Sequence, residues 1–413
     1  MNKINTITLD NGLKIYLYKD SRRHSTFFQF NTYCGGLTKD FVFDEKKYHM
    51  YDGTAHILEH YIVECNSNGN FLDMLGKRQM STNASTSMKV TSYYFETVYD
   101  VLYGIETILN GVYNVIFDDE KLLKLKNPIY QEIRGKFDNK FYHLNRMRVN
   151  ACFNNIEYRD VGGTLDDVKN TTIDDIKTMY KAFYQPKNQF IVIAGNFDED
   201  EVIAKIKDVY SKLDIEEHDA KLINIDDNSN ITNNSDTLYF PTPMNYTEIV
   251  FKVDVGRYSN KELLDLDFYI NSFYSDYFGV TSSIYNDLVN RKVIIDNINC
   301  FDTRISNYLI ISIGAYVNDR DYFANSILNC INELNLFDED KFNINKKNTI
   351  VRLILRDENI FNMIFPFIDN IIYFDYPYLD DVHDVYKLNY EEYKKYISEL
   401  DFSNYAILDI INN

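Results

Sequence analysis

The clearest chemical pattern in this sequence is a pair of histidines with a glutamate beside one of them, His56-Ile57-Leu58-Glu59-His60. Residues four apart in an α-helix lie about 40° apart around the axis, so the imidazoles of His56 and His60 can meet at one ion from successive turns. A catalytic zinc site has three protein ligands and an open position at which a water molecule is activated. A carboxylate beside that position can take the proton of the water, and Glu59 is the expected general base.

The alternative is that His56 and His60 are ordinary residues of an amphipathic helix. With only 7 histidines in the chain, a chance HxxEH has a probability on the order of one in a hundred. The same order of residues is a signature of zinc peptidases, so we favour a metal site. The remaining histidines show no HxxxH or HxH spacing and are expected to be surface or core residues, namely His24, His49, His143, His218 and His383.

Strands and helices must position this motif, and hydrophobic periodicity predicts their order. A helix is expected over about 52–65. Before it, strand-like runs cover 4–19 and 25–34, and the turn sequence Asp10-Asn11-Gly12 predicts a hairpin. After it, we expect a strand over 81–97, helices over 98–115 and from 127 onward, a helix over 173–184, a buried strand over 189–194 and a helix over 199–213. The pattern predicts a mixed α+β domain.

A chain of 413 residues exceeds what one hydrophobic core usually organises, which predicts two domains. The stretch 218–236 is rich in Asp, Asn and Ser, the composition of a solvated linker. We therefore expect domains at 1–217 and 237–413. The second half repeats the order of the first, with a strand over 237–255, helical patterns over 261–290, a strand over 306–317, a helix over 322–334 and a strand over 404–411. This order predicts an internal duplication.

Short segments spread over about residues 1–215 carry a likeness to a known family. They are Leu9-Asp10-Asn11-Gly12-Leu13, Gly53 to His60, Asn83-Ala84-Ser85-Thr86, Thr91-Ser92-Tyr93-Tyr94, Gln131-Glu132-Ile133, Gly163-Thr164, Tyr184-Gln185-Pro186-Lys187-Asn188 and Val192-Ile193-Ala194-Gly195-Asn196. In these segments the sequence resembles the pitrilysin family of zinc peptidases, which includes insulin-degrading enzyme and the mitochondrial processing peptidases. The resemblance implies two duplicated α/β-roll domains, each a mostly antiparallel sheet packed with helices, and a zinc-dependent endopeptidase.

The resemblance assigns the third zinc ligand to Glu132. Asn127-Pro128 suits an N-cap and a first helical position, so Glu132 is expected early in a new helix. The alternatives are that Glu132 is one solvated carboxylate among many, or that Glu64, one turn after His60, is the ligand. Family members usually hold a second glutamate seven residues before the ligand, but Leu125 stands there, so the outer shell is expected to be built differently.

The resemblance also assigns the stretch 83–94 to the strand that receives the substrate. Such a strand lies at a sheet edge and binds an extended peptide by main-chain hydrogen bonds, which demand little of the peptide's sequence. Asn83, Ala84 and Ser85 are expected to line the cleft. The alternative is an ordinary interior strand.

The second half lacks an Arg/Tyr pair that the resemblance would place there. In related enzymes it contributes an Arg and, seven residues later, a Tyr that reach the substrate. If Leu288 is the aligning point, the Arg position holds Val289, and if Arg291 is that Arg, the Tyr position holds Ile298. We therefore expect a homologous partner subunit that supplies the pair in a heterodimer, with a homodimer less favoured. The alternative is a zinc-binding but inactive subunit that holds peptides or has a structural role.

Bulk composition limits the other functions. A net charge of −19 argues against nucleic-acid binding, which depends on clustered Lys and Arg. The five cysteines form no CxxC pair, which indicates a reducing compartment. The first residues lack the build of a signal peptide, and polar residues interrupt the most apolar stretch, 361–379. We expect a cytoplasmic protein that binds no membrane. Unfolded peptides or peptide precursors as substrates are what the resemblance to the pitrilysin family implies.

Overall fold

The computed structural model describes residues 4–413 except 68, 157, 217, 224–226, 228–229, 232, 335–336 and 378–380. The chain divides into two compact units. Unit 1 consists of Met1–Lys136, Arg159–Asn224 and Asn359–Ile372, and unit 2 consists of Phe137–Tyr158, Ile225–Glu358 and Tyr373–Asn413. Each unit therefore contains a segment from the other half of the sequence. The predicted division at 218–236 stays a prediction, and part of that linker lies outside the described residues.

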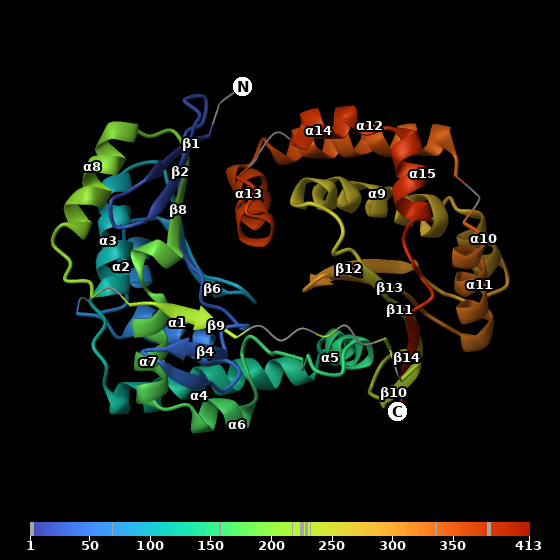
Figure 1. Ribbon diagram of the computed structural model, residues 1–413, viewed down its shortest axis with the longest axis horizontal. Coiled ribbons are helices and arrows are strands. Elements are labelled where there is room, and N and C mark those ends of the chain that lie inside the picture. Colours follow the sequence, from blue (N-terminus) through green and yellow to red (C-terminus); the bar gives the residue numbers. More distant parts are fainter. Residues whose placement is uncertain are drawn as a thin grey trace. The chain divides into compact units, whose positions relative to one another are not determined.

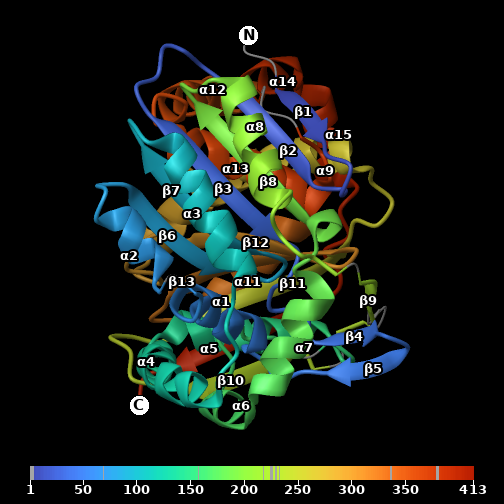
Figure 2. The same cartoon turned by 90° about the vertical axis from the view of Figure 1, so that its left-hand side faces the viewer.

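The described strands of unit 1 form a six-stranded sheet and a small three-stranded sheet (Figures 1 and 2). The strands are β1 (Asn5–Thr8), β2 (Lys14–Lys19), β3 (Thr26–Thr32), β4 (Asp40–Phe43), β5 (Lys46–His49), β6 (Ser81–Thr86), β7 (Thr91–Thr97), β8 (Gln189–Gly195) and β9 (Ala220–Leu222). The large sheet has the order β1-β2-β8-β3-β7-β6, the small sheet the order β5-β4-β9. Only β2 and β8 pair in parallel among these strands.

Helices cover both faces of the large sheet. The helices of unit 1 are α1 (Thr54–Glu64), α2 (Phe71–Gly76), α3 (Val101–Tyr113), α4 (Asp119–Phe137), α6 (Leu165–Asn170), α7 (Ile173–Phe183), η1 (Pro186–Asn188), α8 (Glu199–Tyr210) and α13 (Ile360–Phe374). Figure 2 shows α3 and α8 lying across one face. On the other face the Phe27 ring meets Phe361 and Phe365 of α13 at centroid distances of 5.1 and 5.7 Å. Because both faces are covered, every residue of β3 and β8 is buried.

Unit 2 has the same layered plan. Its strands are β10 (Ser235–Tyr239), β11 (Tyr246–Asp254), β12 (Asn299–Ile305), β13 (Tyr308–Tyr316) and β14 (Tyr405–Ile411), and its helices are α5 (Lys140–Cys152), α9 (Asn260–Phe278), α10 (Ser283–Asn290), α11 (Arg320–Asn332), α12 (Glu339–Arg356), α14 (Asp381–Lys387) and α15 (Tyr390–Ser398). The described strands form one sheet in the order β10-β14-β11-β13-β12. Alternate residues of β11 enter separate cores on the two faces, Ile249 and Phe251 on one and Val250 on the other. The predicted fold class, mostly antiparallel sheets packed with helices, is confirmed.

Some predicted elements were wrong in detail. The stretch 81–97 forms two strands, β6 and β7, joined by a tight turn, and 237–255 likewise forms β10 and β11. The strand β12 was missed. The first hairpin is confirmed for β1 and β2, whereas β8 separates β2 from β3.

The helix that carries Glu132 begins earlier than predicted. Pro128 lies inside α4, which starts at Asp119, and does not open a new helix. A proline removes one backbone hydrogen bond, but the buried residues of α4 continue on both sides of it, with Leu125 before and Ile129 and Ile133 after. Packing of this apolar face therefore outweighs the local helix-breaking signal.

Within the described residues, no helix has the length and the apolar character needed to cross a membrane. All five cysteines are free thiols. The predicted cytoplasmic location stays a prediction.

Candidate metal centre

The metal-binding motif lies on α1, whose start is fixed by two glycine turns that pack backbone to backbone. Gly53 precedes the helix with φ +81°, and Gly163 has φ +71°. A Cβ on Gly53 would lie 2.4 Å from the carbonyl oxygen of Gly162, and a Cβ on Gly163 would lie 2.3 Å from that of Asp52. Only glycine allows this approach and these φ angles. The apolar residues of α1 are buried as well, so the helix is held rigidly.

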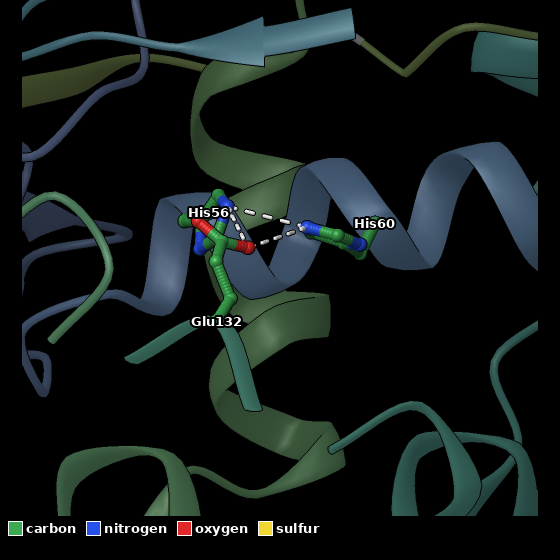
Figure 3. Close-up of side chains that lie close together, drawn as sticks. All are labelled: His56, His60 and Glu132. Carbon is green, nitrogen blue, oxygen red and sulfur yellow. Dashed lines mark hydrogen bonds and ion pairs between the residues drawn. The ribbon is translucent and has the colours of Figure 1, made fainter. Parts of the chain in front are cut away.

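The structure brings His56, His60 and Glu132, the three expected ligands, close together (Figure 3). The Nε2 atoms of His56 and His60 are 3.2 Å apart, and Oε2 of Glu132 lies 3.6 Å from the first and 3.8 Å from the second. Tetrahedral ligands at zinc–nitrogen and zinc–oxygen distances near 2.05 Å are separated by about 3.3 Å. The three donor atoms therefore have the separations of a zinc ligand set.

The electrostatics of the histidines suit metal binding. Burial lowers the pKa of His56 and of His60 below the ordinary value, against the opposing effect of the Glu132 charge. Both imidazoles are therefore neutral near pH 7 and offer a lone pair, as zinc requires. Side-chain exposure rises from 10% at His56 to 32% at His60 and 44% at Glu132, so the group opens to solvent on one side. The residues present thus fit a zinc ion with room for a further ligand.

The surroundings of the ligands differ from a fully supported zinc site. Nδ1 of His56 is buried and has no hydrogen-bond partner within the described part of the chain. Zinc-ligating histidines almost always donate through the second ring nitrogen, which fixes the ring. Leu125 is an apolar, buried residue of α4 and cannot supply such a partner. On the other ligand, Nζ of Lys136 lies 3.6 Å from Oε1 of Glu132 and 3.9 Å from Oδ1 of Asp160.

Glu59 is buried beside this group, with 6% of its surface exposed. Burial raises the pKa of its carboxyl to about 7, the Glu132 charge adds to the increase, and a hydrogen bond from Thr86 opposes it. Oγ1 of Thr86 donates to Oε2 of Glu59 at 2.7 Å. A carboxyl with a pKa near neutrality can both accept and return a proton at pH 7. This environment suits the predicted role of Glu59 as a general base, which stays a prediction.

The other predicted site residues are placed as follows. Glu64, the alternative ligand, is exposed, accepts a hydrogen bond from Asn70 at 2.6 Å and is not part of the ligand cluster found in the described ranges. Asn83, Ala84 and Ser85 lie on β6, which is an edge strand of its sheet. Asn83 and Ser85 are exposed and Ala84 is half-buried. Their role in substrate binding stays a prediction.

Parts of the sequence are similar to known zinc proteases. Residues 170–348 match the family model described as "Peptidase M16 inactive domain". Over 207 residues the chain is 28% identical to "Uncharacterized zinc protease YmfH" of Bacillus subtilis, a match that covers 49% of this chain and 48% of that protein. A match to "Zinc protease PqqE" of Helicobacter pylori is 24% identical over 168 residues and covers 39% of this chain and 38% of that protein. The matches thus span less than half the length of these curated relatives.

The fold is shared with solved structures along the whole chain. A putative M16-like peptidase from Alicyclobacillus acidocaldarius has a TM-score of 0.88 at 21% identity, with 99% of this chain and 98% of that chain covered. A protease from Helicobacter pylori has a TM-score of 0.84 at 17% identity, with 99% of each chain covered. The local sequence matches and the shared fold confirm the predicted resemblance to the pitrilysin, or M16, family. Relatives named as zinc proteases support a peptidase-like role.

The chain has no Arg/Tyr pair at the expected place in its second half. Arg291 follows α10 and donates to Asp287 at 2.8 Å, and Ile298 is buried. Leu288 is also buried, and Val289 is an exposed aliphatic residue. None of these positions carries a phenol hydroxyl.

Among the described residues, Thr86 and Lys136 contact the centre from outside the motif, and sequence reasoning missed both. Thr86 stood inside a segment already assigned to the substrate strand, and its contact with Glu59 depends on how β6 packs against α1. Lys136 follows Glu132 by four residues, a spacing at which oppositely charged side chains meet on a helix, so this contact was available from the sequence.

Proposed function

We propose that this chain is the metal-bearing subunit of a zinc-dependent endopeptidase that cleaves unfolded peptides or peptide precursors. The observation that carries the proposal is the grouping of His56, His60 and Glu132 at zinc-ligand separations with the buried carboxyl of Glu59 beside them. Two neutral imidazoles and one carboxylate are a ligand set found in catalytic zinc sites. The names of the relatives, zinc proteases, support the same class of reaction.

The roles of the chain's own residues follow from this arrangement. His56, His60 and Glu132 would hold the ion, and a bound zinc ion would polarise the scissile carbonyl and lower the pKa of water. Glu59 takes the proton of the attacking water and returns it to the leaving amine. The edge strand β6 receives the peptide as an added strand, with Asn83, Ala84 and Ser85 along it.

A partner subunit is part of the proposal. The chain lacks the Arg/Tyr pair at its expected place, so another chain must supply groups that bind the substrate from the opposite side. One relative is named "Probable mitochondrial-processing peptidase subunit beta" of Arabidopsis thaliana, 24% identical over 172 residues. This name describes a subunit, which favours a heterodimer for this chain over a homodimer. We place this assembly in the cytoplasm.

A second candidate function is a zinc-binding but inactive subunit that holds peptides or has a structural role. The observation that favours it is Nδ1 of His56, which is buried and has no hydrogen-bond partner among the described residues. This is compatible with a site that keeps its ligands after losing its activity.

The test measures zinc content and cleavage of unstructured peptides for the wild type and for Glu59→Gln, each alone and with any homologous chain that co-purifies. Glutamine keeps the size of the side chain but cannot accept the proton. We expect about one zinc per chain in both proteins, and cleavage only by the wild type, in the presence of the partner.

The outcomes separate the candidates. Absence of zinc from the wild type contradicts both. Bound zinc without cleavage under any condition favours the inactive subunit. Cleavage by Glu59→Gln at the wild-type rate removes Glu59 from the mechanism.

A further inference from the structure

A short chain of hydroxyl groups lies behind the Glu59 carboxylate. Oγ1 of Thr86 is 2.7 Å from Oε2 of Glu59 and 3.2 Å from Oγ1 of Thr91, and Oγ1 of Thr91 is 2.7 Å from the carbonyl oxygen of Cys34. Thr86 ends β6, Thr91 begins β7, and Glu59 lies on α1. The chain of hydroxyls therefore links the buried carboxylate to the edge strand.

The protons in this chain can be assigned from the chemistry of its members. A carbonyl oxygen only accepts, so the single proton of the Thr91 hydroxyl is given to Cys34. Thr91 then has no proton for Thr86, and the Thr86 hydroxyl must choose between Thr91 and Glu59 as its acceptor. The contact with Glu59 is shorter and ends on a carboxylate, the stronger acceptor. Thr86 therefore donates to Glu59.

Backbone contacts fix the position of Thr86. In the turn that follows it, the carbonyl oxygens of Ser87 and Met88 accept hydrogen bonds from the amides of Gly36 and Leu37 at 3.0 and 2.8 Å. A Cβ on Gly35 would lie 2.5 Å from the Ser87 carbonyl oxygen, so the two loops are in close contact. The hydroxyl of Thr86 is thus held by the strand, by the turn and by Thr91.

We propose that Thr86 is a positioning residue that orients the Glu59 carboxylate for proton transfer and ties it to the strand that receives the peptide. This inference rests on the proposed function. Thr86 both ends β6 and binds Glu59. The register in which a peptide pairs with β6 therefore decides which of its peptide bonds lies beside Glu59. The position of the bond that is cleaved is then set by this register.

The experiment compares three variants of the full chain, assembled with its partner. Thr86→Val removes the hydroxyl and keeps a β-branched side chain of similar size. Thr86→Ser restores the hydroxyl. Thr82→Val makes the same change on the same strand, where the hydroxyl donates to the Tyr94 carbonyl instead of a carboxylate. The readouts are kcat and KM for an unstructured peptide, zinc affinity, and crystal structures of the wild type and Thr86→Val.

A charge-assisted hydrogen bond of this kind supports a loss of about 10–100-fold in kcat for Thr86→Val, with KM and zinc affinity within about twofold of the wild type. Thr86→Ser should stay within about threefold, and Thr82→Val should match the wild type. In the crystals, Glu59 should adopt one conformation in the wild type and leave it in Thr86→Val.

Several results overturn the inference: an unchanged kcat in Thr86→Val, an equal loss in Thr82→Val, or a Glu59 carboxylate that stays in place without the hydroxyl. The crystal readout does not depend on activity. If the wild type cleaves nothing but Glu59 moves in Thr86→Val, the proposed function has failed and the positioning role stands. If the wild type cleaves and Glu59 does not move, the positioning role alone has failed.

Discussion

Replacement of Glu132 by glutamine should weaken zinc binding by at least about 100-fold. Mutation of a residue that only hydrogen-bonds to a metal ligand typically lowers metal affinity 10–100-fold. Glu132→Gln alters a ligand itself and removes its negative charge. Aspartate should not restore binding. It is shorter by one carbon–carbon bond of about 1.5 Å, so its oxygen would lie roughly 5 Å from the Nε2 atoms of His56 and His60, compared with 3.6 and 3.8 Å for glutamate.

The assay is competition for zinc between the full chain and a chromophoric chelator at constant pH and ionic strength. Glu120→Gln is the matched control because it makes the same chemical change in the exposed first turn of the same helix. Thermal unfolding of the metal-free proteins checks that α4 is intact in each variant. We expect Glu120→Gln to bind zinc like the wild type.

A Glu132→Gln protein that binds zinc within about threefold of the wild type would refute the reasoning from geometry. In that case Glu64→Gln becomes the informative variant. A loss of affinity there would assign the third ligand to the residue one turn after His60.

Three further predictions concern the framework around the centre. Gly163→Ala should destabilise the protein by at least about 2 kcal/mol, because the new Cβ would meet the Asp52 carbonyl oxygen at φ +71°; an unchanged melting temperature contradicts this. Arg148→Met should cost about 3–5 kcal/mol, because it strands the buried Glu248 carboxylate, and the double variant Arg148→Met/Glu248→Leu should recover most of the loss in thermal unfolding. Burial raises the pKa of Asp276 to about 6, above the unfolded value of 3.8. The folded protein therefore loses stability as Asp276 ionises, over the range from about pH 4 to pH 6. Asp276→Asn should therefore raise the free energy of unfolding at pH 7.5 by about 1–2 kcal/mol, after allowance for solvent screening, and leave it unchanged at pH 4. A difference in melting temperature that does not vary with pH contradicts this prediction.

The sequence predicted the elements whose hydrophobic pattern is strong. The metal helix, expected over 52–65 and observed as Thr54–Glu64, has apolar residues on nearly every side, and its glycine start is visible in the sequence. Local signals failed where packing decides. The turn Ser87–Val90 contains no Gly, Pro, Asn or Asp, so 81–97 gave no sign of a break between β6 and β7. At 241–243 the same error had another cause, because two prolines correctly marked a break that the predicted strand ran through.

The candidate site was predicted in part for a similar reason. His56, Glu59 and His60 lie within one helix, so their spacing alone indicates chemistry. Glu132 could be reached only through the resemblance, since its helix was predicted to begin at the wrong residue. The contact of Thr86 with Glu59 arises because β6 packs against α1, and the two residues are 27 positions apart. No local sequence pattern indicates such a contact.

Helix α13 has a consequence for synthesis of the chain. It is built from residues near position 360, yet its aromatic residues cover one face of the first sheet, where they meet Phe27 and Tyr94. A ribosome that has finished the first 217 residues must add roughly 140 more before this cover exists, which takes about 7–30 s at ordinary elongation rates. During that interval the nascent sheet exposes an aromatic surface, and general chaperones that bind apolar segments have their opportunity to act on it. A chain truncated at the predicted linker, 218–236, would therefore lack α13, which is one layer of the core of unit 1.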